Sequence, residues 1–164
     1  MIARRITFCF VYIAFALHLI VACSSPAQNL QGEHWTIFPE QQARKLGVAG
    51  WVTTSGHTAD YWTPAQESVF ALEDGVAVFL QENSDRFYEQ GTPVWERLDE
   101  YNRQYIGIVL DEKRIVYANF FCSSFDIDWR EEFVMVLDGG DCFFQFKYDV
   151  DSDTLFDLQV NGIG

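Results

Sequence analysis

Positive charge is scarce in this sequence of 164 residues, in which 24 Asp and Glu outnumber 11 Lys and Arg and give a formal net charge of -13. A chain so acidic is not expected to bind nucleic acid or anionic membrane surfaces, because its own potential repels phosphate groups. A basic protein partner or a cation is compatible with this charge, and so is a plain role in solubility. The composition therefore excludes some classes of partner and identifies none.

Motifs that carry chemistry are also missing. The sequence has no nucleophile elbow of the G-x-S-x-G type, and its three histidines have no spacing that suits zinc. An acid–base pair of His57 and Asp60, or a nucleophilic Cys122, would make the chain an envelope hydrolase. Incidental histidines in a surface loop account for the same residues, so we predict no catalytic residue and no cofactor.

Three aspartates, Asp149, Asp151 and Asp153, stand two residues apart in the stretch "DVDSDT". Oxygen ligands at alternating positions are typical of calcium loops, but the glycine and the distal glutamate of such a loop are missing here. Aspartate is also common in turns for conformational reasons. The three residues are therefore only weak candidates for metal ligands, and we predict no metal site.

The long apolar run of the sequence extends from Ile6 to Ala22 and follows the basic start "MIARR". A basic start before a short apolar core is the layout of a secretory signal. The run is marginal for a membrane span, which needs about 20 apolar residues, and the ionisable His18 would be costly in hydrocarbon. We therefore expect a signal for export rather than a permanent transmembrane helix.

The run ends in "IVAC", residues Ile20 to Cys23, which resembles the lipobox of bacterial lipoproteins. The resemblance covers residues 1–23 only. It implies that Cys23 is acylated and that residues 1–22, the signal peptide, are removed. Ser24, rather than Asp, after the cysteine implies sorting to the outer membrane, facing the periplasm or the cell surface.

The mature chain is expected to consist of a tether and one domain. Residues 23–33 are small and polar and predict a flexible, lipidated tether, whose acyl chains would hold the protein on the membrane. Residues 34–164 are long enough for a single domain with its own core. Removal of Arg4 and Arg5 with the signal would move the net charge from -13 to -15.

Four cysteines reduce to two after such processing, because Cys9 is removed and Cys23 carries lipid. Cys122 and Cys142 then remain in an oxidising compartment, which favours a disulfide. Strand geometry opposes it, because a strand "FVMVL" (133–137) between them in a simple meander would put them at opposite ends of the sheet. The pairing stays open, and a bond is expected to require a sheet that is not a plain meander.

A helix is the clearest element, in the stretch 63–85, with Thr63 as its capping residue. Its apolar side chains recur at helical spacing and are Val69, Leu72, Val76, Phe79 and Leu80. A short helical turn is also expected around Glu40 to Leu46.

From residue 103 the apolar period becomes two, with a charged turn at 111–114 and a glycine turn at 138–141. The predicted strands are 104–110, 115–122, 133–137, 142–150 and 155–162. We predict an α+β fold, with one long N-terminal helix packed on an antiparallel sheet of about five strands. The helix is expected to bury against Ile106, Ile108, Val116, Phe144 and Phe146. This order of elements resembles that of cystatin-like and nuclear transport factor 2-like folds.

Three functions fit these observations. The first is a non-enzymatic binding or envelope-associated domain on a lipid anchor, whose partner is a basic protein or an envelope component. The second is a hydrolase that uses His57, Asp60 or Cys122. The third is an inhibitor of a basic enzyme such as a lysozyme. We prefer the first, because no catalytic motif supports the second and no specific motif supports the third.

Overall fold

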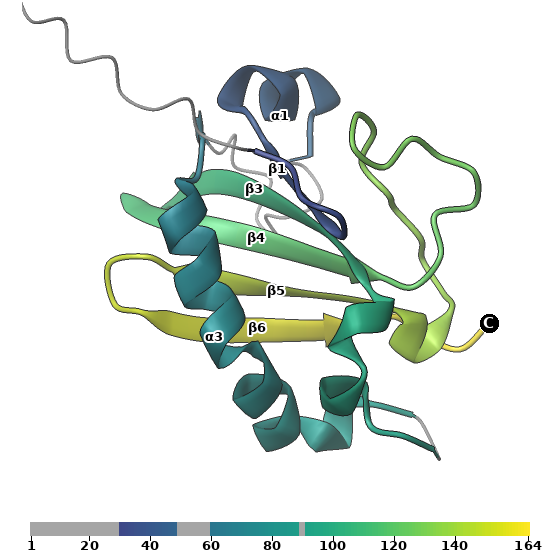
Figure 1. The fold of residues 1–164 in the computed structure, drawn as a ribbon. Coiled ribbons are helices and arrows are strands. Elements are labelled where there is room, and N and C mark those ends of the chain that lie inside the picture. Colours follow the sequence, from purple (N-terminus) through teal and green to yellow (C-terminus); the bar gives the residue numbers. More distant parts are fainter. Residues whose placement is uncertain (1–29, 49–59, 89–90) are drawn as a thin grey trace, which may run out of the picture.

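The computed structural model describes residues 30–48, 60–88 and 91–164 and shows an α+β domain (Figure 1). Within these residues a six-stranded sheet is accompanied by two α-helices. The strands are β1 (Trp35–Phe38), β2 (Asp60–Trp62), β3 (Asn102–Leu110), β4 (Lys113–Phe121), β5 (Phe143–Asp149) and β6 (Thr154–Val160). The helices are α1 (Glu40–Leu46) and α3 (Gln66–Glu82). The α+β class predicted from the sequence is confirmed.

The sheet is mixed. Strands β3 to β6 form an antiparallel meander, whereas β1 runs parallel to β3. β1 pairs with residues 103–106 of β3 and β2 pairs with residues 107–109, so the two short strands share one edge of β3. The prediction of an antiparallel sheet is therefore wrong at this edge. β1 has four residues and β2 has three, which is too few to show a period of two in the sequence.

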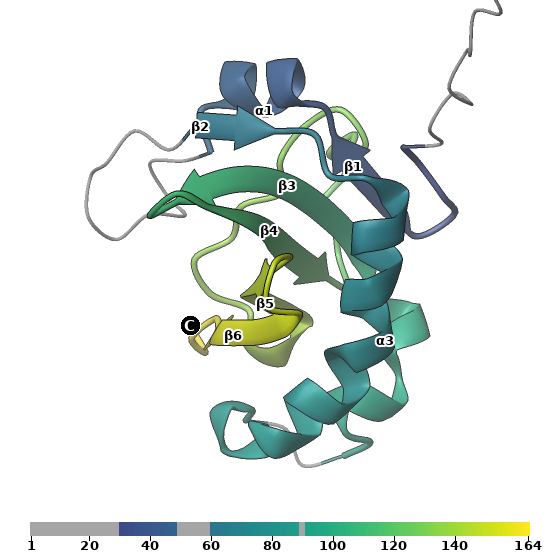
Figure 2. The same cartoon turned by 90° about the vertical axis from the view of Figure 1, so that its left-hand side faces the viewer.

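Helix α3 covers one face of the meander (Figure 2). Its buried residues are Val69, Leu72, Val76 and Leu80. They share one apolar cluster with the sheet residues Tyr105, Val116, Ala118, Phe120, Phe144, Phe146, Tyr148 and Leu158. The predicted packing of the helix on Val116, Phe144 and Phe146 is thus confirmed. β1, α1 and β2 precede α3 in the chain, so the long helix is not the first element of the domain.

Ile106 and Ile108 lie on the opposite face of the sheet, and their predicted contact with the long helix is wrong. A two-residue turn of Asp111 and Glu112, with φ angles of 49° and 65°, joins β3 to β4. Such a turn pairs odd-numbered residues of β3 with even-numbered residues of β4. The β3 side chains that face α3 therefore come from odd positions, such as Tyr105, because a change of one residue in register exchanges the two faces.

Helix α1 covers part of the opposite face. Its cluster contains Phe38, Ala43, Val48, Tyr61, Ile106, Ile108 and Ile115. The predicted helical turn at Glu40–Leu46 is confirmed. The predicted cap of the long helix is wrong, because Thr63 Oγ1 instead accepts a hydrogen bond of 2.9 Å from the backbone nitrogen of Glu40, the first residue of α1. Ala65 occupies the N-cap of α3 without a side-chain hydrogen bond.

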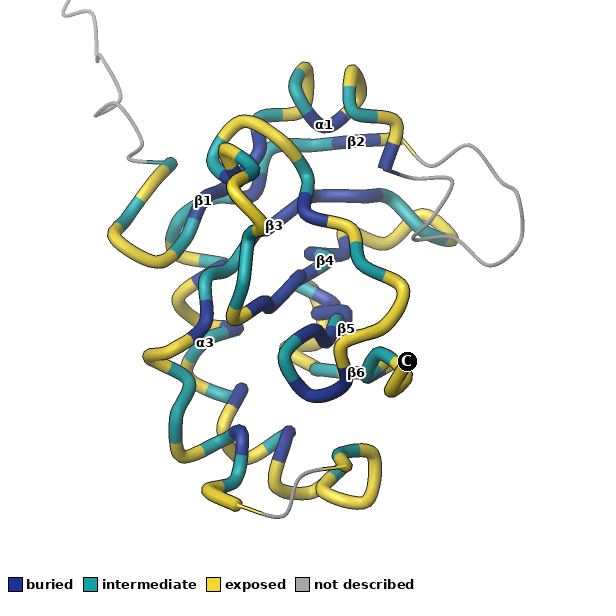
Figure 3. The backbone as a smooth tube through the Cα atoms, turned by 90° about the vertical axis from the view of Figure 1, so that its right-hand side faces the viewer, coloured by how far each residue is buried: buried dark blue, intermediate teal, exposed yellow. Residues whose placement is uncertain are grey.

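The connection from β4 to β5, residues 122–142, covers the rest of that face and is mostly exposed or half-buried, with Trp129, Val134, Gly140 and Asp141 buried (Figure 3). Its segment "FVMVL" (133–137) is not the strand predicted from its apolar run. Val134 is buried, whereas Leu137 is 83% exposed. Gly139 and Gly140 have φ angles of 96° and 56°, as expected for turn glycines. No hairpin forms there, because the segment before the turn lies outside the sheet.

Two buried amides hold this connection on the sheet. Gln104 Nε2 donates to the carbonyl oxygens of Trp129 (2.6 Å) and Glu132 (2.7 Å). Gln104 Oε1 accepts from Asn119 Nδ2 and from the backbone nitrogen of Val134, both at 3.0 Å. Asn119 Nδ2 also donates to the carbonyl of Val134 at 2.8 Å. Side chains of β3 and β4 therefore supply bonds that a neighbouring strand would otherwise supply.

A disulfide joins Cys122, just after β4, to Cys142, just before β5, with 5.1 Å between the two Cα atoms. The backbone nitrogen of Cys122 also donates to the carbonyl of Cys142 at 3.0 Å. Because residues 133–137 are not a strand, β4 and β5 are direct neighbours and the meander itself brings the two cysteines together. The expectation that a bond would require a different topology is wrong, since it depended on that extra strand.

Candidate functional site

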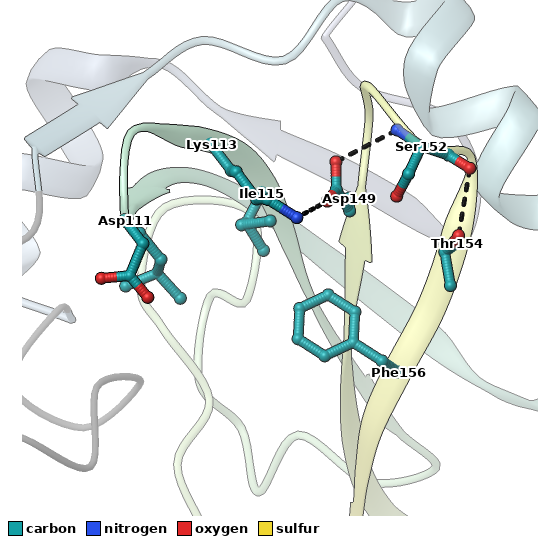
Figure 4. A pocket seen from close by; sticks show the side chains of 8 residues that line it. Asp111, Lys113, Ile115, Asp149, Ser152, Thr154 and Phe156 are labelled. Carbon is teal, nitrogen blue, oxygen red and sulfur yellow. Dashed lines mark hydrogen bonds and ion pairs between the residues drawn. The ribbon is translucent and has the colours of Figure 1, made fainter.

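A pocket of about 380 Å³ lies between the β3–β4 turn and the β5–β6 turn (Figure 4). It is lined by the apolar residues Leu110, Ile115 and Phe156, the charged residues Asp111, Lys113 and Asp149, and the hydroxyl residues Ser152 and Thr154. In Figure 4 the side chain of Lys113 points toward Asp149 and that of Asp111 points away from it. The site is thus an apolar depression with a charged rim.

Asp149 makes hydrogen bonds to both the β3–β4 hairpin and the β5–β6 turn. Its Oδ2 accepts from Lys113 Nζ at 3.0 Å, and its Oδ1 accepts from the backbone nitrogens of Asp151 (3.0 Å) and Ser152 (3.2 Å). The hydrogen bond from Lys113 lowers the pKa of Asp149, and the same bond raises the pKa of Lys113. The carboxylate is therefore ionised at neutral pH and has a partner on both of its oxygens.

The other two candidate ligands of a metal point to partners of their own. Asp151 Oδ1 lies 2.9 Å from a terminal nitrogen of Arg114, and Asp153 Oδ1 accepts from the hydroxyl of Tyr148 at 2.7 Å. Burial and this hydrogen bond raise the pKa of Tyr148 to about 12. In the part of the chain that the structure describes, no three Asp, Glu, His or Cys side chains converge as metal ligands. Each of the three aspartates therefore has a partner within the described residues.

Asp60 and Cys122, the two described residues of the hydrolase hypothesis, are not brought together. Cys122 is bonded to Cys142, so it has no free thiol. Asp60 begins β2 and pairs with Val109, whereas Cys122 follows the strand end that pairs with Asn102. Seven residues of strand separate these positions, or about 23 Å. His57 and the lipidation candidate Cys23 lie outside the described residues.

In the described residues neither pocket hydroxyl has a histidine beside it, and Ser152 lies against the Asp149 carboxylate. Thr154 Oγ1 donates to the carbonyl of Ser152 at 3.0 Å. His34, the histidine within the described ranges, is remote from the pocket and contacts Asn102 Oδ1 at 3.3 Å. A depression of this kind can hold an apolar group, and the contact of Lys113 with Asp149 within it is an ion pair that joins the two turns.

Comparison with protein-family models, curated proteins and solved structures gives no match to this chain. Function must therefore be inferred from the residues themselves. The helices described here, α1 and α3 among them, are all too short or too polar to cross a bilayer.

A second candidate site is the solvent-facing side of α3. We define the outer face of α3 as the exposed residues Glu67, Phe70, Ala71, Asp74, Ala77, Val78, Gln81 and Glu82. Phe70 is 48% exposed and Val78 is 59% exposed. The signal for this face was present in the sequence, because no Lys or Arg occurs from Thr63 to Asp85.

Most described cations are already bound to carboxylates of the same chain. The ion pairs are Arg44 with Glu40, Arg97 with Glu100, Arg103 with Glu73, Lys113 with Asp149, Arg114 with Asp151, and Lys147 with Asp157. In the described ranges, Glu67, Asp74 and Glu82 on the outer face of α3 take part in none of them. The ion pairs among the described residues therefore leave the negative charge on this face without a partner.

Beneath this face, Glu73 projects from α3 toward the sheet. Its carboxylate accepts a hydrogen bond from the hydroxyl of Tyr105 and lies 3.0 Å from Arg103 Nε. The terminal nitrogens of Arg103 donate to the carbonyls of Tyr101 (3.0 Å) and Leu98 (2.8 Å). Burial raises the pKa of Glu73, and the charge of Arg103 opposes this effect only in part.

The opposing effects of burial and of Arg103 on the pKa of Glu73 should make the stability change caused by Glu73→Gln depend on pH. A carboxyl group whose pKa is raised by folding contributes most stability below its ordinary pKa of 4.5 and loses that contribution as pH rises through the folded value. The unfolding free energy of the native chain minus that of Glu73→Gln should therefore fall from acid to neutral pH. Denaturant titrations at several pH values measure it, with the exposed Glu67→Gln as control. A difference that grows with pH would show that attraction to Arg103 outweighs burial.

Proposed function

We propose that this protein is a lipid-anchored envelope protein that binds a positively charged protein partner and does no catalysis. In this proposal residues 1–22 are removed, Cys23 carries the lipid, and the domain is held at the outer membrane. The lipobox-like end of the apolar run supports the anchor. The Cys122–Cys142 bond supports an oxidising compartment, because structural disulfides persist outside the cytoplasm.

The uncompensated negative charge of the domain carries the proposal. Most of its described Lys and Arg side chains form ion pairs with carboxylates of the same chain. The outer face of α3, in contrast, has three carboxylates and no Lys or Arg. Such a field raises the association rate of a basic partner and disfavours acidic ones.

An inhibitor of a basic enzyme such as a lysozyme is the second candidate. The same negative charge favours it, since the inhibited enzyme would be one kind of basic partner. A hydrolase is less favoured, because Cys122 is in a disulfide and Asp60 lies at the other end of β3.

Binding to proteins of matched fold and opposite charge tests the proposal. The full chain, purified in non-ionic detergent, is titrated with lysozyme, cytochrome c and the succinylated form of each, in which lysines become carboxylates. We expect the basic forms to bind and the succinylated forms not to bind. The affinity should fall when salt rises from about 50 mM to about 300 mM, because exposed charges are then screened.

Two outcomes contradict this proposal. One is the absence of binding by both basic proteins at low salt, and the other is equal binding of the succinylated forms. Lysozyme activity is measured in the same samples. Inhibition at a one-to-one ratio would favour the inhibitor, and binding without inhibition would favour the binding domain.

A further inference from the structure

We propose that the outer face of α3 is the docking surface for the basic partner, and that the docking segment carries apolar side chains between its Lys and Arg residues. This inference rests on the proposed function in one respect, that the partner is basic. It adds where the partner binds and what else it must contain.

The apolar content of the outer face is the first argument. Phe70 and Val78 are about half exposed, and Ala71 and Ala77 lie exposed beside them. Valine is a weaker helix former than the Lys, Glu or Gln usual at such positions, so helix stability does not explain Val78. Phe70 also contacts the partly buried Trp35, and the two rings meet edge-on with 6.0 Å between their centres. A partner that buries these side chains gains the hydrophobic contribution of their exposed area.

The arrangement of charge is the second argument. Glu67, Asp74 and Glu82 follow one another along the helix at intervals of seven and eight residues, or about 10–12 Å. The first basic residue after Thr63 is Arg86, beyond the carboxyl end of α3. Arg103, which lies beneath the helix, is already bound to Glu73. None of the ion pairs among the described residues reaches this face, so a partner that supplies cations would complete it.

These two features specify one kind of occupant. Long Lys or Arg side chains can lay their aliphatic stems on Phe70 and Val78 and reach the carboxylates with their charged ends. A basic amphipathic helix about as long as α3 meets this requirement, since it repeats side chains at the same intervals. An anionic surface is excluded by repulsion, and a purely apolar one would leave three carboxylates desolvated without partners.

Two rival surfaces are weaker. The apolar residues Leu137 and Ile163, at the carboxyl end of the domain, are more exposed than Phe70, but no charge pattern indicates what covers them. The pocket between the turns has its buried carboxylate, Asp149, already satisfied.

The test is a peptide titration on the full chain in non-ionic detergent. The probe is a labelled helical peptide of about 18 residues built from Lys and Leu, which matches the length of α3. The control probe has Ser in place of each Leu. One triple variant neutralises the face by Glu67→Gln, Asp74→Asn and Glu82→Gln. The matched variant removes the same three charges elsewhere by Asp60→Asn, Asp111→Asn and Glu132→Gln.

We expect the face variant to bind the Lys/Leu peptide about tenfold more weakly, because three exposed ion pairs are lost, and the matched variant to lose less than about threefold. A Phe70→Ser/Val78→Ser variant should bind the Lys/Leu peptide about fivefold more weakly and the Lys/Ser peptide no more weakly than the native chain does. Equal losses in the two triple variants would overturn the docking site and leave the proposed function standing. Absence of binding by either peptide and by the basic proteins would overturn both.

A crosslinking experiment guards against variants that fold poorly. A benzophenone on Val78→Cys should capture the Lys/Leu peptide, whereas the same group on Glu132→Cys, on the other side of the sheet, should not. Equal capture at both positions would reject the site.

Discussion

Replacing Phe144 with alanine is expected to lower the free energy of unfolding by about 3–5 kcal/mol. Phe144 is fully buried in the layer between α3 and the sheet. Its ring lies 5.0 Å from that of Phe120, 5.2 Å from that of Tyr101 and 5.8 Å from that of Phe87. Alanine loses all three contacts and leaves a cavity that packed strands cannot close. A domain of this size has a total stability of about 5–15 kcal/mol, so the variant should be at or near the limit of folding.

Denaturant unfolding of Phe144→Ala and Phe125→Ala compares a buried with an exposed phenylalanine. Phe125 is 62% exposed and contacts Phe143 on one side. Its removal should cost less than about 1 kcal/mol. Equal losses in the two variants would mean that Phe144 is not at the centre of the core.

Replacing Gln104 with leucine is the second large effect that we expect, about 3 kcal/mol or more. Leucine has a similar volume, so the loss does not arise from a cavity. It arises from four groups that lose their partner: the carbonyls of Trp129 and Glu132, the backbone nitrogen of Val134 and one amide hydrogen of Asn119. Each buried polar group left unsatisfied costs about 1–3 kcal/mol. The connection can recover part of this loss only by leaving the sheet and exposing these groups to water.

Two measurements on Gln104→Leu separate these responses. Denaturant unfolding gives the global loss, and amide hydrogen exchange over residues 129–136 reports detachment of the connection. Gln159→Leu, at an exposed position of β6, is the control and should change stability by less than about 0.5 kcal/mol. A Gln104→Leu variant with native stability and native exchange would refute the role of this amide.

The long helix and the strands β3 to β6 could be predicted because their side chains alternate with a clear period. Which side chains of β3 and β6 face α3 was harder to predict. The β3–β4 turn has only two residues, so a prediction that leaves its length open cannot decide whether Tyr105 or Ile106 faces α3. In β6, Phe156 pairs with Lys147 and Gln159 with Gln145, so a bulge lies between them. Asp157, with a φ of 55°, is at that bulge, and nothing in the local pattern marks it.

The segment "FVMVL" explains why the strand predicted at 133–137 and the topology expected around the two cysteines are both wrong. Its apolar residues resemble a buried strand, and Val134 is in fact buried. Its backbone is held by Gln104 and Asn119, which in the sequence are ordinary polar positions of two other strands. A contact between residues so distant in the chain has no local signal. The expected separation of Cys122 and Cys142 depended on that strand and is wrong for the same reason, although an oxidising compartment would favour the bond.

Of the candidate site, the charge could be seen in the sequence and the geometry could not. The absence of Lys and Arg from 63 to 85, together with the helical period, places Glu67, Asp74 and Phe70 away from the apolar side. That most of the described cations are bound to other carboxylates depends on pairs such as Lys113 with Asp149, which are 36 residues apart. The turn aspartates could likewise be assigned to turns rather than to a metal only with their partners known.

The intact mass of the native chain tests the central claim, that this is an exported and lipid-anchored domain. The chain is produced with its own amino-terminal segment in a Gram-negative bacterium, extracted from membranes and treated with a thiol reagent before and after reduction. We predict a protein that starts at Cys23 with an added lipid mass. It should take up no reagent before reduction and two equivalents afterwards, at Cys122 and Cys142. An intact Met1, a different unmodified amino terminus, or reactive thiols before reduction would contradict the claim.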